Sequence, residues 1–254
     1  MDTELGSAAV AVHGGAYRRF VKKLLSGPSA PDQAMHDAIG GEFEAMGVIE
    51  LDLLISVGLR PDSSVVDVGC GSGRLAAPLS RYLTGPYLGT DVVPDLLDYA
   101  RRLANRDDWR FEVAEGLRIP APDSSADIVC FFSVLTHLRH EESFRYLEEA
   151  KRVSRPDGRI VFSFLEFAIP SHWIVFEKDV AEIGFDQPVN QFMSRDGIDA
   201  FARNLGLEVV QYLDGDTPNI PLSQPVRFSN GQTFTDLAPL GQSVAVLRRI
   251  SPTG

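Results

Sequence analysis

The sequence predicts an α/β protein built on a seven-stranded, mostly parallel sheet with helices on both faces. The first observation behind this prediction is the stretch Val65-Val66-Asp67-Val68-Gly69-Cys70-Gly71-Ser72-Gly73, where a β-branched run ends in an acid and alternating glycines. Such a pattern is typical of a buried parallel strand that turns tightly into a helix. The second observation is the alternation of further apolar runs with helical patterns, which indicates right-handed βαβ units.

Two helices are expected before the first strand. Residues 17–25 form a short helical pattern that glycine and proline end, and residues 42–57 place apolar side chains along one side of a second helix. Residues 1–16 are small, polar and rich in Gly and Ala, so we expect them to be poorly ordered. Residues 1–41 are therefore predicted to be a flexible segment with a cap helix, followed by one domain over residues 42–254.

The domain is expected to contain strands at 64–68, 87–90, 109–113, 128–132, 159–165, 208–213 and 243–248, and helices at 74–82, 94–105, 141–153 and 195–205. Pro94 suits a first helical position, while Ser194 and Gly206 are typical caps of the last helix. Residues 155–158 predict a turn before the fifth strand. Residues 214–241 are rich in Pro, Gly, Asn and Ser, so the last strand lacks a crossover helix and is expected to pair antiparallel.

Composition limits the class of partner. The 254 residues carry a net charge of −11, which disfavours nucleic acid because phosphate binding needs a basic surface. Cys70 and Cys130 fall in or beside predicted core strands, so we expect buried thiols in a reducing compartment. No apolar run reaches the length of about 18 residues that predicts a membrane helix, and the N-terminus lacks a secretory signal. A cytoplasmic protein without membrane insertion is expected.

The glycine turn predicts a site for a nucleoside-containing cofactor. A Cβ in this turn would hold a nucleotide-like ligand away from the backbone, and the following helix start offers N–H groups to a carboxylate or phosphate. NAD-binding folds use a similar turn with glycines in the order G-x-G-x-x-G. Here the glycines are Gly69, Gly71 and Gly73, and Arg74 occupies the third dinucleotide position.

From about residue 42 to 249, the chain resembles the class I S-adenosylmethionine-dependent methyltransferases, in particular the small-molecule subgroup with quinone and natural-product enzymes. The matching motifs are Asp67-Val68-Gly69-Cys70-Gly71-Ser72-Gly73, Leu88-Gly89-Thr90-Asp91, Phe111-Glu112-Val113-Ala114-Glu115-Gly116, Asp127-Ile128-Val129, Val134-Leu135-Thr136-His137-Leu138 and Arg152-Val153-Ser154-Arg155-Pro156-Asp157-Gly158-Arg159. The resemblance implies a Rossmann-like fold with an antiparallel last strand and an N-terminal helical cap.

The resemblance also implies S-adenosyl-L-methionine as the cofactor and no metal. The glycine turn would hold the methionine portion, and Asp91 would accept both ribose hydroxyls. Glu115 would read the adenine amine, although the family more often has Asp there. The implied cofactor-binding residues are Asp67, Gly69, Gly71, Gly73, Asp91, Val92, Glu115, Gly116 and Ser133.

Methyl transfer from a sulfonium is an in-line displacement, in which the protein mainly positions the acceptor. A hydroxyl acceptor also benefits from a general base, and His137 is the first candidate because it follows the fourth strand at the ligand-binding edge. His172 and Glu166 are further candidates. A structural role for His137 at the loop–helix junction stays open. His140 is interpreted as part of a solvated helix face rather than as a metal ligand.

The leading hypothesis is a methyltransferase acting on a hydroxyl or amine of a small metabolite, such as a natural product or a sugar-like molecule. Acceptor recognition is expected from the N-terminal part and from two inserts, 166–193 and 214–241. In the first insert, Trp173 and Phe176 either face a flat acceptor or pack in a helix core. The alternatives are a C-methyltransferase of a quinone-like lipid precursor and a cofactor-binding protein without transferase activity. The sequence is also compatible with a homodimer of this chain.

Overall fold

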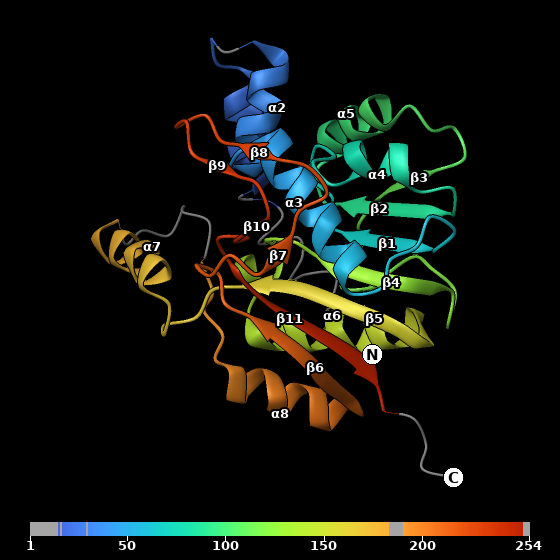
Figure 1. The fold of residues 1–254 in the computed structure, drawn as a ribbon. Coiled ribbons are helices and arrows are strands. Elements are labelled where there is room, and N and C mark those ends of the chain that lie inside the picture. Colours follow the sequence, from blue (N-terminus) through green and yellow to red (C-terminus); the bar gives the residue numbers. More distant parts are fainter. Residues whose placement is uncertain (1–14, 16, 29, 183–189, 251–254) are drawn as a thin grey trace.

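The computed structural model describes residues 15, 17–28, 30–182 and 190–250 (Figure 1). Its main sheet contains β1 (Val65–Val68), β2 (Tyr87–Asp91), β3 (Arg110–Val113), β4 (Ala126–Phe131), β5 (Ser154–Phe164), β6 (Leu207–Leu213) and β11 (Ser243–Arg249). The strand order is β3-β2-β1-β4-β5-β11-β6. Pairing is parallel from β3 to β5, whereas β11 runs antiparallel to both β5 and β6. The predicted antiparallel last strand is confirmed.

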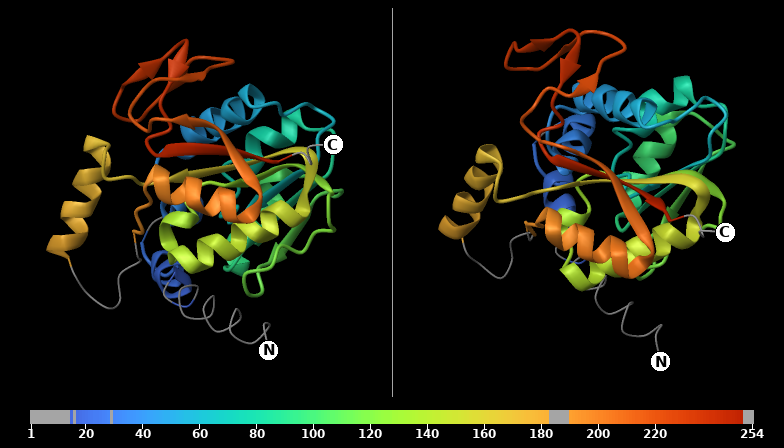
Figure 2. Two further views of the ribbon diagram at one scale, coloured as in Figure 1. Left: turned by 90° about the horizontal axis from the view of Figure 1, so that it is seen from below. Right: turned by 60° about the horizontal axis from the view of Figure 1, so that its bottom comes forward.

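Helices cover both faces of this sheet (Figures 1 and 2). They are α2 (Pro31–Ile39), α3 (Phe43–Ser56), α4 (Ala76–Tyr82), α5 (Pro94–Ala104), α6 (His140–Val153), α7 (Pro170–Ala181) and α8 (Arg195–Leu205), with a short 3₁₀ turn η1 (Leu135–His137) and a further helical stretch at 17–25. Side chains of α3, α4 and α5 form one hydrophobic cluster, and those of α6 and α8 form another. The expected two-faced arrangement is therefore confirmed.

The burial of β1 and the turn at its end explain where the site lies in the sheet. Val65 packs into the cluster of α3, α4 and α5, whereas Val66 and Val68 pack into that of α6 and α8. Both faces of the strand are thus buried, which explains a continuous apolar run in place of an alternating pattern. The strand ends at the glycine turn, at the same edge of the sheet as the ends of β2, β4 and β5.

The N-terminal part caps this edge. The helix over residues 17–25 and α2 pack on the segment after β2 through a small cluster that contains Val21, Ala38, Val93 and Leu96. The predicted helical cap is present. The expectation of poor order for residues 1–16 concerns residues that, except for Gly15, lie outside the described ones.

Three local features differ from the sequence predictions. The sequence pattern did not predict α2 or α7, and each begins at a proline, Pro31 or Pro170. Proline suits that position because the first N–H groups of a helix have no partner within it. The predicted separate turn at 155–158 is wrong, since these residues belong to β5, where they form an irregularity in its register with β4.

Residues 214–241 contain no helix, as their composition predicted, and they form two short ribbons. The ribbons pair β7 (Ile220–Pro221) with β10 (Leu237–Ala238), and β8 (Val226–Arg227) with β9 (Thr233–Phe234). Their apolar side chains pack on the cluster of α3, so the ribbons lie beside α3 at the capped edge (Figure 1). Within the part of the chain that the structure describes, every helix falls short of the length and hydrophobicity that a membrane crossing requires.

Candidate functional site

The glycine turn after β1 can be built only from glycine. Gly69, Gly71 and Gly73 have φ angles of 74°, 54° and 91°, in the left-handed region that side chains avoid. A Cβ on Gly69 would overlap the Val134 side chain, and a Cβ on Gly71 would lie 2.6 Å from Ile39 Cγ2. The turn therefore needs glycine both for its backbone conformation and for the close approach of α2 and of the segment after β4.

Asp91 ends β2 directly beside this turn. Its carboxylate accepts the N–H of Gly71 at 3.1 Å and the N–H of Val93 at 2.8 Å, and the residue is 6% exposed. Burial raises the pKa of Asp91 to about 6, against the lowering effect of these hydrogen bonds. The acid is thus held at the turn by two backbone donors, and each oxygen still has a lone pair for a further donor.

The other residues singled out after β2, β3 and β4 lie at the same edge. The Val92 carbonyl accepts from Arg18 Nε at 2.7 Å, so the cap helix contacts this segment directly. Glu115 is exposed just past β3, and the neighbouring Gly116 carbonyl accepts from the Tyr146 hydroxyl at 3.3 Å. These positions place exposed polar groups beyond the strand ends, where open α/β sheets bind ligands.

Asp67 points into the protein interior. It is 2% exposed, and its Oδ2 accepts from the Tyr87 hydroxyl at 2.8 Å. Burial raises the pKa of Asp67 to about 7, and the Tyr87 hydrogen bond opposes this shift. Cys70 and Cys130 are free, buried thiols near the acid, as the sequence predicts for two core cysteines.

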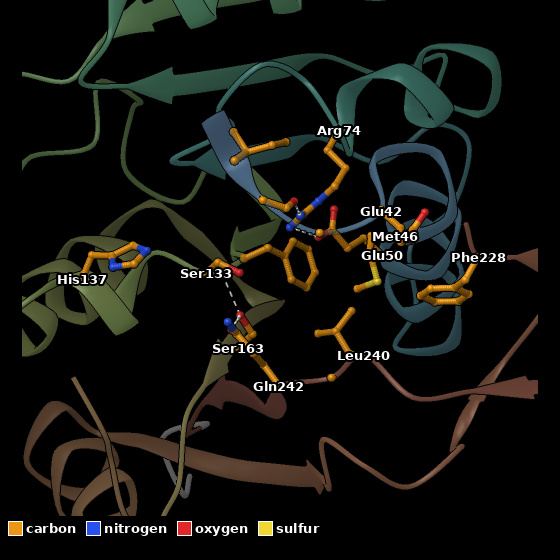
Figure 3. A pocket seen from close by; sticks show the side chains of 15 residues that line it. Glu42, Met46, Glu50, Arg74, Ser133, His137, Ser163, Phe228, Leu240 and Gln242 are labelled. Carbon is orange, nitrogen blue, oxygen red and sulfur yellow. Dashed lines mark hydrogen bonds and ion pairs between the residues drawn. The ribbon is translucent and has the colours of Figure 1, made fainter. Parts of the chain in front are cut away.

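A cavity of about 380 Å³ opens at the ends of β4 and β5, beside the glycine turn (Figure 3). Its apolar lining comes from Ile39, Met46, Phe132, Phe228 and Leu240, and thus from the cap, α3, the end of β4 and the 214–241 ribbons. The walls therefore combine segments that are far apart in the sequence. We call this cavity the edge pocket.

An ion pair forms part of one wall of the edge pocket (Figure 3). Arg74 lies 2.5 Å from the Glu50 carboxylate, and the two side chains are 11% and 2% exposed. Burial raises the pKa of Glu50, whereas the Arg74 charge lowers it. Arg74 also donates to the Gly40 carbonyl at 3.2 Å, so it connects the glycine turn to the junction between α2 and α3.

A row of hydrogen bonds forms the opposite wall. The Ser133 N–H donates to Ser163 Oγ at 2.8 Å, and the Ser163 hydroxyl donates to Gln242 Oε1 at 2.7 Å. His137, on η1, is an exposed residue that also lines the pocket. The polar groups of this wall thus follow β4, lie near the end of β5 and precede β11 (Figure 3).

Comparison with known proteins agrees with this architecture. Residues 66–162 match the family model described as a methyltransferase domain. The 27-O-demethylrifamycin SV methyltransferase of Amycolatopsis mediterranei is 30% identical over 155 residues, which are 59% of this chain and 56% of that protein. The demethylmenaquinone methyltransferase of Deinococcus radiodurans is 38% identical over 111 residues, 42% of this chain and 44% of that protein.

A malonyl-[acyl-carrier protein] O-methyltransferase of Hahella chejuensis is 31% identical over 180 residues, 68% of this chain and 60% of that protein. The chain thus spans about half of the length of these curated relatives. Among solved structures, magnesium protoporphyrin IX methyltransferase from Synechocystis PCC 6803 with bound SAH has a TM-score of 0.61. That similarity covers 95% of this chain and 98% of the other at 14% identity, so it shows the fold alone.

Residues 66–162 of this chain thus match a methyltransferase domain, and this match covers β1 to β5. The structural similarity shows a shared fold over 95% of the chain.

Of the three residues that the sequence suggested as a general base, only His137 reaches the edge pocket. His172 is 1% exposed, with Nδ1 accepting the Glu166 N–H at 3.0 Å and Nε2 donating to the Gly241 carbonyl at 3.1 Å. Glu166 is 4% exposed and pairs with Arg195 at 2.8 Å. Both side chains are buried and neither lines the pocket, so their positions do not support a role as base.

The other residues that the sequence singled out, His140, Trp173 and Phe176, lie outside the edge pocket. Among the described residues, no group of three or more His, Cys, Asp and Glu side chains is arranged to hold a metal ion. His140 starts α6 and contacts the Phe192 carbonyl at 2.9 Å. Trp173 and Phe176 pack against each other on α7, which stands apart from the sheet (Figure 2). The described part of the 166–193 insert contributes no residue to the edge pocket.

Sequence reasoning missed several residues that line the edge pocket. The polar ones are Glu50, Ser163 and Gln242, and the apolar ones include Phe228 and Leu240. Gln242 directly precedes β11 and Ser163 is near the end of β5, so both occupy the edge where the cofactor turn lies. A search for polar residues at the ends of all the sheet's strands, β11 included, would have found these two.

Proposed function

We propose that this methyltransferase transfers the methyl group of S-adenosylmethionine to a hydroxyl or amine of a small-molecule acceptor. The edge pocket carries this proposal. Its volume of about 380 Å³ and its apolar walls suit a small molecule, since ligand sites are mainly apolar with a few placed polar groups. A net charge of −11 disfavours a nucleic-acid acceptor.

The residues around the glycine turn fit the cofactor. Gly69 and Gly71 allow the left-handed backbone of this tight turn, and the Asp91 carboxylate has lone pairs for the ribose hydroxyls. Glu115, exposed beyond β3, would meet the adenine amine. When bound, the cofactor supplies an electrophilic methyl group. The remaining task of the protein is to hold the acceptor in line with it.

A hydroxyl acceptor is favoured by two observations. The relatives from Amycolatopsis mediterranei and Hahella chejuensis are named for methylation at oxygen. His137 lines the pocket and is exposed, so its imidazole lies where a general base would take a proton from an acceptor hydroxyl. Met46, Phe132 and Phe228 would pack against the apolar part of the same acceptor.

A second candidate is C-methylation of a quinone-like lipid precursor. The 38% identity to a demethylmenaquinone methyltransferase supports it, as do the apolar pocket walls. The two candidates differ in their products, because methyl–carbon and methyl–oxygen bonds give distinct ¹³C chemical shifts when the donor methyl is labelled.

Calorimetry with S-adenosylmethionine tests the cofactor assignment, with wild type compared to Asp91→Ala and NAD as the control ligand. We expect binding by wild type, loss of most of it in the variant, and no heat with NAD. Binding of NAD, or equal binding by the variant, would overturn the assignment.

The acceptor class is then tested with ¹³C-methyl-labelled cofactor and a panel of phenols, sugars, amines and naphthohydroquinones. Formation of S-adenosylhomocysteine with a labelled O- or N-methyl product would support the proposal. A labelled C-methyl product would establish the second candidate. Cofactor binding with no turnover of any panel member would favour a binding protein without transferase activity.

A further inference from the structure

Ser133 has an unfavourable backbone conformation inside the edge pocket. Its φ angle is 59°, in the left-handed region that residues with a Cβ seldom adopt. In the described part of the chain, two other non-glycine residues share this feature: Asn105, which caps α5, and Ser124 in the turn before β4. Turns and caps tolerate such angles routinely, whereas Ser133 lies in a candidate binding site, where strain of this kind needs surrounding support.

The support comes from a buried serine on the neighbouring strand. The Ser133 N–H donates to Ser163 Oγ at 2.8 Å, and Ser163 is 1% exposed. Because an N–H can only donate, the Ser163 oxygen accepts this bond, and its own proton goes to Gln242 Oε1 at 2.7 Å. The direction of both hydrogen bonds is thereby fixed, and Gln242 holds the Ser163 hydroxyl in the orientation that receives Ser133 (Figure 3).

The turn that these bonds hold in place also contacts the cofactor turn. Val134 follows Ser133, and its side chain lies where a Cβ on Gly69 would be. β4 pairs directly with β1, so the turns after the two strands are neighbours. A change in the Ser133 backbone would therefore move the side chain that packs on Gly69.

We propose that Ser163 and Gln242 are positioning residues that keep Ser133 in the left-handed conformation and thereby shape the cofactor site. This inference rests on the proposed function, since the ligand concerned is S-adenosylmethionine. Gln242 enters from the start of β11, opposite β5, so the antiparallel side of the sheet takes part in forming the cofactor site on its parallel side.

Ser163→Ala and Ser243→Ala form a matched pair for the test. Both serines are buried and make two hydrogen bonds, but Ser243 bonds to Glu166 and Gly215, outside the pocket. Calorimetry with S-adenosylmethionine and thermal melting without it are measured on each variant. We expect Ser163→Ala to bind about tenfold more weakly, the effect of one hydrogen bond, and Ser243→Ala to bind normally despite a lower melting temperature.

Rescue by glycine separates positioning from general destabilisation. Glycine adopts a positive φ without strain, so Ser133→Gly should reduce the need for the Ser163 bond. We expect the loss of affinity caused by Ser163→Ala to shrink to about threefold or less in the Ser133→Gly background. Ser124→Gly, at the other strained serine, should leave the loss at its full size.

Gln242 gives a second test at a less buried position, which decides the matter if Ser163→Ala does not fold. Gln242→Glu keeps the oxygen that accepts from Ser163, and Gln242→Leu removes it. Retained affinity in the first variant and weaker binding in the second support the proposal. If wild type binds the cofactor while these variants and Ser163→Ala bind equally well, the proposal is overturned and the proposed function stands. No binding by wild type would refute both.

Discussion

Asp91 combines deep burial with the proposed binding of ribose hydroxyls, which would require its charge. Burial raises its pKa to about 6, so a proton competes with the ribose hydroxyls for the carboxylate below that pH. We expect the affinity for S-adenosylmethionine to fall as the pH drops through about 6, by about tenfold for each further pH unit. Calorimetry between about pH 5 and pH 8 measures this profile.

The control for this prediction is Asp91→Asn, which keeps the shape of the side chain and has no charge to lose. It should bind weakly, with an affinity that no longer changes across the same pH range. An identical pH profile in wild type and in this variant would show that some other group controls cofactor binding.

His137 and His172 lie in opposite environments, so the same kind of substitution should affect different properties. His137→Gln at the exposed pocket edge should slow turnover by about a hundredfold, as expected for loss of a general base, and should destabilise the fold less than a change at the buried His172. His172→Leu leaves the Glu166 N–H and the Gly241 carbonyl without partners, which should lower the unfolding free energy by about 2–4 kcal/mol. Urea unfolding and S-adenosylhomocysteine formation distinguish the two outcomes, and wild-type turnover in His137→Gln would remove it as the base.

At the scale of elements, α2 ends directly on the glycine turn. Ile39, its last residue, approaches Gly71 so closely that Gly71→Ala must displace either the helix or the turn. We expect this substitution to lower the unfolding free energy by about 2–4 kcal/mol, from overpacking together with the left-handed φ. Thermal and urea unfolding measure the loss.

Ile39→Ala separates the two contributions. It removes the methyl group that meets the new Cβ, whereas the strain of the left-handed φ remains. Gly71→Ala should therefore lower the unfolding free energy by less in the Ile39→Ala background than in wild type. Full additivity of the two substitutions would mean that α2 does not pack on the turn in solution.

The sequence predicted those elements whose boundaries are set by neighbouring residues. α8 has the predicted bounds because the Ser194 side chain accepts from the Gly197 N–H and Gly206 takes the left-handed φ of 66° that ends the helix. α2 and α7 were missed for a local reason as well, since a proline that starts a helix can be mistaken for one that ends it. The residues at 155–158 have turn composition, and within β5 they form the irregularity between the pairs Ala126–Ser154 and Ile128–Arg159.

At the scale of the whole molecule, some residues of the candidate site could be predicted from the sequence and others could not. The glycine turn and Asp91 are visible in the sequence because each directly follows a recognisable strand. The hydrogen bond between Ser163 and Gln242 joins residues 79 positions apart, and it depends on β11 entering the sheet beside β5. Phe228 reaches the pocket only because the ribbons fold back onto α3. Such contacts follow from the chain topology and have no local pattern.

The buried charge of Asp67 affects the stability of the whole fold. Its pKa rises from an ordinary 3.8 to about 7 because of burial, so at intermediate pH the folded protein retains a proton that the unfolded chain releases. Asp67 should therefore make the unfolding free energy fall as the pH rises from about 4 to 7, with a slope approaching 1.4 kcal/mol per pH unit. Asp127 and Glu149, whose pKa values are lowered, act in the opposite direction, and their contributions are lost only as the pH falls below their ordinary pKa values.

Asp67→Asn isolates this contribution, because it retains an oxygen for the Tyr87 hydroxyl and carries no charge at any pH. The variant should be more stable than wild type above pH 7, and the difference should shrink steadily toward pH 4 as Asp67 becomes protonated in the unfolded chain as well. Urea unfolding without cofactor, at several pH values for both proteins, gives this difference directly. Parallel pH profiles of the unfolding free energy in the two proteins would show that Asp67 has the same pKa in the folded and unfolded states. Asp67 would then not be buried in the folded protein in solution.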